Sequence, residues 1–189
     1  MSNAKSRVEL WLILAVCAAP VIAAYAVFYG WQPQQGTMNY GELLPAQPLP
    51  DPALQLSDGH AFRLSELRGK WVLLQVDSGA CAETCQQKLY AMRQVRLTQG
   101  KEMERIERAW VIDDGHTPAP LLLQEYSGTW PVRDADGALL KALPANRSAR
   151  DHIYAIDPLG NVMLRFPPDA DPRKMVKDIA RLLKVSRIG

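Results

Sequence analysis

The order of apolar and polar positions divides the chain into one long apolar run and a larger region of short alternating segments. Residues 10–29 contain no charged side chain. A helix of about 20 residues is about 30 Å long, which matches the hydrocarbon thickness of a bilayer. Trp11 and Trp31 lie near its two ends, where indole rings favour the membrane interface. The pattern predicts one transmembrane anchor within residues 1–31.

The flanks of this run predict its orientation. Lys5 and Arg7 precede the run, and the next lysine or arginine is Arg63. Because positive charge stays in the cytoplasm, the C-terminal part is expected outside it, which is the periplasm if the anchor lies in a bacterial inner membrane. The apolar run is long for a signal peptide and no small-x-small cleavage site follows it, so we expect it to be retained.

A proline-rich segment follows the predicted anchor. Residues 32–52 contain five prolines and two glycines, which predict a stiff linker without regular structure. We therefore expect the folded domain to occupy residues 53–189.

Short periodic segments predict the elements of that domain. Residues 54–64 alternate around Asp58-Gly59, which is typical of a β-hairpin. An apolar strand and a helical pattern follow, and the C-terminal third predicts a hairpin and a closing helix that begins at Asp171-Pro172. Residues 102–108 are charged and expected to be exposed, and residues 127–150 give no clear pattern. The predicted elements are strand 70–76, a helix ending near Gly100, strand 109–112, helix 121–126, strands 153–156 and 162–166, and the closing helix.

Two cysteines lie where the strand 70–76 meets the helix that follows it. Cys81 is expected just before the first helical turn and Cys85 within it. Free N–H groups and the helix dipole at this position favour a thiolate, whereas the carboxylate of Glu83 opposes it. The two sulfurs can therefore form a disulfide or hold one soft metal ion, and a purely structural disulfide is the simpler alternative.

Composition narrows the possible functions. The chain has 189 residues and a formal net charge of +2, which gives no reason to expect nucleic-acid binding. It has three cysteines, of which Cys17 falls in the apolar run. One remaining pair is too little for a disulfide-built scaffold, so the core must come from packing.

The order of elements and the Cys-x-x-x-Cys motif resemble a known family. A strand–helix–strand unit followed by a hairpin and a helix is the thioredoxin-like arrangement, an α/β fold with a central mixed sheet flanked by helices. With the anchor, the linker, the pair Cys81 and Cys85, and the segment 151–160, the chain resembles the Sco/SenC family of membrane-anchored copper proteins. That resemblance implies a role in assembling the copper centre of cytochrome c oxidase. The implied partners are membrane lipid and an oxidase subunit or another assembly factor.

The resemblance also implies a Cu(I) site. Its ligands would be Cys81, Cys85 and a distal histidine, for which His152 is the candidate and His116 the second choice. Thiolates and imidazole suit Cu(I), and His152 opens a strand expected beside the cysteine strand. The chain departs from the family pattern because Ala82 and Gln86 stand where proline usually follows each cysteine.

Three functions remain open from the sequence. The first is the metallochaperone and assembly factor just described. The second is an enzyme, a periplasmic dithiol–disulfide oxidoreductase that binds no metal. The third is a non-catalytic scaffold in oxidase assembly. Only the first function needs a third ligand, so His152 distinguishes it from the second.

Overall fold

The N-terminal part of the chain is a single helix. A computed structural model describes residues 2–30 and 39–186, which fall into an N-terminal unit and a C-terminal unit. Helix α1 (Ser2–Gly30) covers the predicted anchor and contains Pro20. Within the two described ranges, no helix has both the length and the apolar character needed to cross a membrane. The anchor over residues 10–29 therefore stays a prediction, and Trp31 lies outside the described residues.

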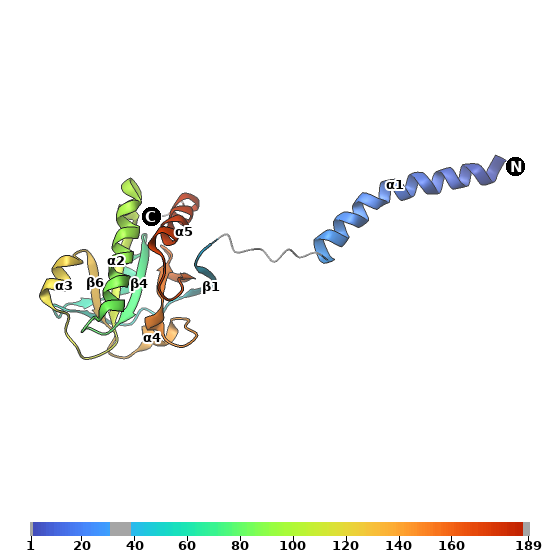
Figure 1. Cartoon of the computed structure of the whole chain (residues 1–189). Coiled ribbons are helices and arrows are strands. Elements are labelled where there is room, and N and C mark those ends of the chain that lie inside the picture. Colours follow the sequence, from blue (N-terminus) through green and yellow to red (C-terminus); the bar gives the residue numbers. More distant parts are fainter. Residues whose placement is uncertain (1, 31–38, 187–189) are drawn as a thin grey trace. The chain divides into compact units, whose positions relative to one another are not determined.

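The C-terminal unit is built around one mixed sheet (Figure 1). The described strands follow the order β1-β8-β7-β4-β5-β6-β2-β3. Strand β4 is parallel to β5 and antiparallel to β7, and β5 is parallel to β6. The strands are β1 (Glu42–Pro48), β2 (Leu54–Leu56), β3 (Ala61–Phe62), β4 (Trp71–Asp77), β5 (Ile106–Ile112), β6 (Thr129–Arg133), β7 (Ile153–Ile156) and β8 (Asn161–Arg165).

Helices cover both faces of this sheet. Helices α2 and α5 lie side by side over one face, in green and red in Figure 1. The helices of this unit are α2 (Glu83–Thr98), α3 (Pro120–Glu125), α4 (Ala138–Ala142) and α5 (Pro172–Val185), with shorter 3-10 turns η1 (Leu64–Leu67), η2 (Gly100–Arg105) and η3 (Ala149–Asp151). The mixed sheet flanked by helices confirms the thioredoxin-like fold.

Strand β4 forms the centre of this arrangement because every one of its residues is buried. Its side chains alternate between two cores, with Leu73 facing α2 and α5 and Leu74 facing the opposite layer. The apolar stripe of α2 packs on the first core through Leu89 and Met92. The hydrophobic periods of the sequence thus predicted these elements correctly.

The predicted linker is wrong at its C-terminal end. Residues 42–48 form β1, which pairs with β8, so the C-terminal unit begins at Asn39 rather than at residue 53. Two prolines are tolerated there because β1 is an edge strand, where a missing N–H leaves no broken ladder bond. The backbone N–H of Gly41 also donates to the buried Asp178 carboxylate at 2.8 Å, which fixes the entry to the strand. Residues 31–38 of the predicted linker lie outside the described residues.

The prediction that residues 102–108 are exposed is wrong at the start of β5. Residues 102–108 were expected to be exposed, yet β5 begins at Ile106 and the side chain of Arg108 is buried. Its guanidinium donates to the Ser127 carbonyl at 2.7 Å. Burial lowers the pKa of Arg108 to about 10, and the nearby guanidiniums of Arg96 and Arg93 act in the same direction. The segment 127–150, which showed no pattern, contains β6, α4 and the start of η3.

Candidate thiol site

The two cysteines meet at the C-terminal end of β4. Cys81 lies in the loop after the strand and Cys85 in the first turn of α2, as predicted. They form a disulfide with their Cα atoms 5.1 Å apart, which is one of the two arrangements that the sequence allowed. Both are buried, with 2% of Cys81 and 0% of Cys85 exposed. A partner molecule therefore reaches either sulfur only after local movement of the loop.

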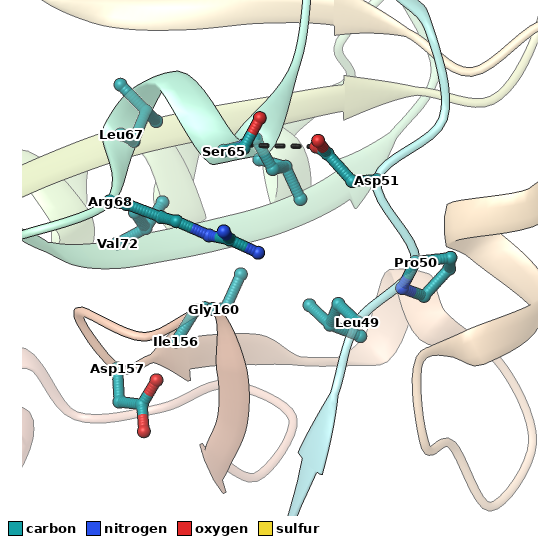
Figure 2. Close-up of a pocket in the computed structure, with 11 residues that line it drawn as sticks. Leu49, Pro50, Asp51, Ser65, Leu67, Arg68, Val72, Ile156, Asp157 and Gly160 are labelled. Atoms are coloured by element: carbon teal, nitrogen blue, oxygen red, sulfur yellow. Dashed lines mark hydrogen bonds between the residues drawn. The ribbon is translucent and has the colours of Figure 1, made fainter.

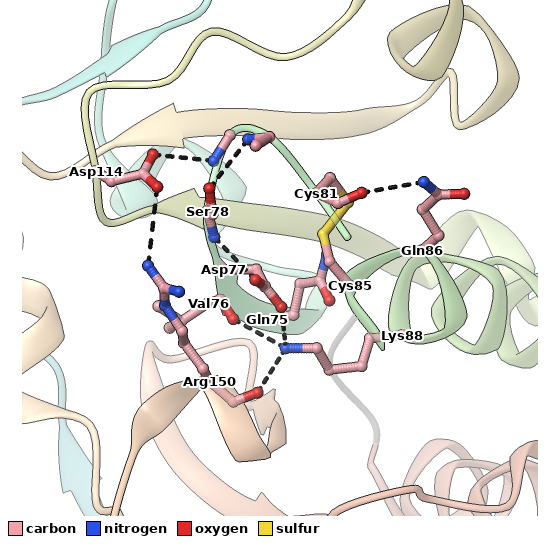
Figure 3. The surroundings of a disulfide bond; sticks show 12 residues. Gln75, Val76, Asp77, Ser78, Cys81, Cys85, Gln86, Lys88, Asp114 and Arg150 are labelled. Atoms are coloured by element: carbon pink, nitrogen blue, oxygen red, sulfur yellow. Dashed lines mark hydrogen bonds and ion pairs between the residues drawn. A yellow bond between two sulfur atoms is a disulfide. The ribbon is translucent and has the colours of Figure 1, made fainter. Parts of the chain in front are cut away.

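The loop that carries Cys81 has an unusual backbone. Cys81 has a φ angle of 43°, a left-handed conformation that a residue with a Cβ atom rarely adopts. Two hydrogen bonds, each 3.0 Å long, hold it there. Its own N–H donates to the Ser78 carbonyl, and the Gln86 side chain donates to the Cys81 carbonyl, as Figure 3 shows for the second bond. Such conformations persist only where the surroundings fix them, and they are concentrated at functional sites.

A second loop packs directly on the first. The Gly79 N–H donates to the Asp114 carboxylate at 3.0 Å, and a Cβ atom on Gly79 would lie 2.0 Å from the His116 carbonyl oxygen. Partial desolvation raises the pKa of Asp114, but hydrogen bonds from Ser78, Gly79 and His116 outweigh it and hold the pKa well below its usual range. The ionised carboxylate of Asp114 thus connects the β5–α3 loop to the loop that carries Cys81.

Lys88 joins three segments beneath the disulfide loop (Figure 3). Its ammonium forms an ion pair with Asp77 at 2.8 Å and donates to the carbonyls of Val76 and Arg150 at 2.9 and 2.6 Å. Burial lowers the pKa of Lys88, and the Asp77 carboxylate limits that effect. The helix α2 is in this way attached to the end of β4 and to η3.

Arg150 continues this network to the β5–α3 loop. Its guanidinium forms two hydrogen bonds to the Asp113 carboxylate, at 2.7 and 2.6 Å, and lies 3.8 Å from Asp114. The hydrogen bonds that the guanidinium donates to Asp113 raise the pKa of Arg150. The segments around the disulfide are therefore connected by ion pairs rather than by apolar packing alone.

Gln75 lies directly behind the disulfide. It is fully buried on β4, and its side-chain Nε2 donates to Cys85 Sγ at 3.7 Å. Within residues 2–30 and 39–186, its Oε1 atom has no hydrogen-bond partner. This amide is a buried polar group in contact with a sulfur atom, within the apolar part of β4.

The structure does not bring His152 to the cysteines. Strand side chains alternate between faces, and Ile153 belongs to the core that contains the disulfide whereas Tyr154 belongs to the opposite core. The His152 ring is buried edge-on against Tyr154, with a centroid distance of 5.9 Å. Its Nδ1 atom is 2.8 Å from the Phe166 carbonyl. The ring therefore lies on the far side of the sheet from Cys81 and Cys85. We expected His152 to reach the cysteines because its strand is next to theirs, and that expectation is wrong.

The second histidine candidate lies nearer in the fold. His116 lies in the loop that packs on Gly79, and its ring is exposed, with Nδ1 3.0 Å from the Asp114 carboxylate. Among the described residues, no group of three histidine, cysteine or acidic side chains is arranged to hold a metal ion. The cysteine pair is thus brought together without either histidine candidate.

Two hollows differ in their relation to this site. A groove of about 890 Å³ runs beside the N-terminal turn of α2, between η3 and residues 168–170, and it is lined by the residues on either side of Cys81, Ala80 and Ala82. A cavity of about 30 Å³ lies away from the cysteines, between the β1–β2 segment, η1 and the β7–β8 turn (Figure 2). The small cavity has room for little more than water. The groove is the candidate binding surface because it borders the loop that carries Cys81.

Sequence reasoning missed the polar residues that surround the pair. Gln75 and Asp77 interrupt or end an apolar strand, and a polar side chain in a buried strand is itself a signal for a specific partner. Lys88 follows Cys85 by three positions on α2, which places both on one side of the helix. Arg150 and Asp114 belong to segments that are distant in sequence, so no local pattern could predict that they join this network.

A disulfide at the start of the helix that follows a central buried strand of a mixed sheet defines a thioredoxin-fold thiol protein. Residues 71–186 match the family model described as "Transmembrane-like, thioredoxin-like, C-terminal domain". The chain belongs to this family. A comparison with curated protein sequences gives no significant match.

Solved Sco structures share the fold. Yeast Sco1 with copper bound has a TM-score of 0.60 and 17% identity, covering 74% of this chain and 94% of that one. Apo Sco1 from Thermus thermophilus has a TM-score of 0.58 and 20% identity, covering 79% and 98%. Arabidopsis thaliana ScoI with copper bound has a TM-score of 0.59 and 11% identity, covering 74% and 100%. The predicted resemblance is confirmed at the level of the fold.

Proposed function

We propose that the chain is a Sco-like thiol protein whose Cys81–Cys85 pair alternates between a disulfide and a dithiol that binds Cu(I). The observation that carries this proposal is the placement of both sulfurs at the start of α2, close enough to bond to each other. Side chains that can form a disulfide can also hold one ion between two thiolates. The helix N-terminus favours the deprotonated thiols that metal binding requires.

The residues present fit Cu(I) through two sulfurs. Soft thiolates select Cu(I) over harder cations. The copper-bound Sco structures of yeast and Arabidopsis thaliana support copper as the metal for this fold. His152 is not part of the proposed site because its ring lies against Tyr154 on the opposite face of the sheet. The proposed site therefore uses Cys81 and Cys85 alone, after reduction of their disulfide.

The biological setting follows from the family resemblance. Copper would be handed on for assembly of the copper centre of cytochrome c oxidase, with an oxidase subunit or another assembly factor as partner. The location would be the outer side of a bacterial inner membrane, with the domain in the periplasm. This part rests on the charge distribution around residues 10–29 and on the resemblance.

A Cu(I) competition titration of the full chain tests the proposal. The reduced protein should bind one Cu(I), and the disulfide form should bind none. Cys81→Ser and Cys85→Ser should each weaken binding by at least about 100-fold because one of two thiolate ligands is lost. His152→Ala should leave affinity within about twofold. Equal binding by the reduced protein and by the double cysteine variant would refute the copper site, and a large loss in His152→Ala would restore the histidine as a ligand.

A metal-free dithiol–disulfide oxidoreductase is the second candidate. It is favoured by the groove beside the pair, whose rim carries the carboxylates of Glu83, Asp151 and Asp169. Its two cations, Lys88 and Arg150, are held by carboxylates, so the groove suits a positively charged segment of a partner protein. Disulfide exchange with a cysteine-bearing basic peptide, by a reduced chain that binds no Cu(I), would establish this function in place of the first.

A further inference from the structure

We propose that Gln75 is a positioning residue that makes the Cys81–Cys85 disulfide easier to reduce. The inference rests on the proposed function, since it concerns the passage of the pair from disulfide to dithiol. It starts from the side-chain amide of Gln75, which is buried and whose Nε2 lies 3.7 Å from Cys85 Sγ. Among the described residues, no other buried amide contacts a sulfur of the pair.

The amide of Gln75 is poorly satisfied in the disulfide state. Its Nε2 donates to a disulfide sulfur, which is a weak acceptor, and its Oε1 has no partner among the described residues. The indole N–H of Trp110, in register with Gln75 on the neighbouring strand, is also without an acceptor in that part of the chain. An unpaired buried polar group costs free energy, so this state carries a penalty at the amide.

Reduction supplies the partners that the amide lacks. Two thiol molecules deliver two electrons and two protons, the S–S bond breaks, Cys81 and Cys85 become thiols, and the reductant becomes a disulfide. The Cys85 thiol can then donate its S–H to Gln75 Oε1. After deprotonation, the thiolate accepts a hydrogen bond from Nε2 that is stronger than the one to the disulfide. Either assignment of the amide oxygen and nitrogen gives the reduced state the better hydrogen bonds.

The alternative reading is that Gln75 only fills space in the core. Its position on β4 faces α2, with Leu73 two residues earlier in the same core. A space-filling residue could be replaced by leucine or methionine without any change in the redox equilibrium. The two readings therefore differ in a measurable quantity other than stability.

The test is a redox titration of the full chain in glutathione buffers, with the dithiol fraction measured by alkylation and mass spectrometry. Gln75→Leu and Gln75→Met should each lower the equilibrium constant for reduction about tenfold, which is about 30 mV. Two substitutions keep the test open if one of them impairs folding.

Gln87→Leu is the matched control, because Gln87 is an exposed glutamine on the same helix as Cys85, and its side chain donates a hydrogen bond to Glu83 at 3.3 Å. Its redox equilibrium should stay within about twofold of wild type. Folded Gln75 variants with an unchanged constant would overturn the inference, as would an equal shift in the control. A wild-type disulfide that thiols cannot reduce in the native state would instead overturn the proposed function.

Discussion

At the scale of single residues, the disulfide loop packs so closely on its neighbour that there is no room for a side chain at position 79. Gly79 touches the β5–α3 loop so closely that a Cβ atom would lie 2.0 Å from the His116 carbonyl oxygen. That oxygen also accepts a hydrogen bond from Arg133 at 3.1 Å, which limits its movement. The absence of a side chain at position 79 is therefore a requirement of the site rather than of the local turn.

Gly79→Ala should separate the two loops and destabilise the protein by about 1–3 kcal/mol, the usual cost of overpacking. Urea denaturation measures the change. Gly115→Ala is the control, because a Cβ atom there would meet nothing within 4 Å. Equal stability of Gly79→Ala and wild type would show that the loops separate freely.

Asp114 predicts a specific response to acid. Its pKa is lower in the folded state than in the unfolded state, so its contribution is complete above the unfolded value and is lost as pH falls toward the folded one. Asp114→Asn should therefore be less stable at neutral pH and lose less stability on acidification below about pH 4. Thermal denaturation as a function of pH measures this. The exposed Asp136, changed to Asn, should keep the wild-type profile.

Also at this scale, the cysteine pair could be predicted from sequence because its chemistry is local. Both residues lie at one strand–helix junction, where motif spacing and helix position determine the geometry. His152 could not be placed by the same reasoning, because being next to a strand does not say which face the ring occupies. The alternation through Ile153 and Tyr154 decides that question and puts the ring in the opposite core.

At the scale of elements, one buried ion pair connects α2, β4 and η3. Lys88 and Asp77 have side chains that are 14% and 11% exposed, so neither charge is well solvated. Removing one partner of such a pair leaves the other charged and buried, which is costly, whereas replacing both can be tolerated. The attachment of η3 to α2 also passes through Lys88, because the Arg150 carbonyl accepts from its ammonium.

Lys88→Met should therefore destabilise the protein by about 3 kcal/mol, and the double change Lys88→Met with Asp77→Leu should recover part of that loss. The free energies of unfolding of Lys88→Met, of Asp77→Leu and of the double variant, measured in urea, test the pair. A double variant as unstable as the sum of the two single variants would show that the two charges are not coupled.

Local periodicity predicted α2, β4, α5 and the β7–β8 hairpin because burial of their own side chains determines them. It failed where the partner is distant in sequence. Strand β1 exists because β8, more than 100 residues later, offers it a free edge, and its prolines resemble a linker until that pairing is known. Strand β6 was not predicted for the same reason, because its pairing with β5 and β2 leaves no local pattern in the sequence.

At the scale of the whole molecule, the two units have separate roles in the account. The C-terminal unit contains the disulfide and the groove, and the N-terminal unit is the helix that the sequence predicts as an anchor. The predicted anchor determines in which compartment the C-terminal unit lies. That compartment matters for the thiol chemistry, because a disulfide persists only in an oxidising environment.

The predicted topology can be tested with a reporter fused to the C-terminus of the full chain. Alkaline phosphatase, which needs export to be active, should be active, and a cytoplasm-dependent fluorescent reporter should be dark. Changing Lys5 and Arg7 to Glu tests the charge argument and should reduce export. An active cytoplasmic reporter on the unaltered chain would place the pair in a reducing compartment.

Copper K-edge X-ray absorption of the reduced full chain loaded with one Cu(I) tests the central claim most directly. Two sulfur ligands are predicted, with a spectrum that is unchanged in His152→Ala and in which one sulfur is lost in Cys85→Ser. A spectrum with no sulfur ligand, or one with histidine scattering that disappears in His152→Ala, would contradict a Cu(I) site made by Cys81 and Cys85 alone.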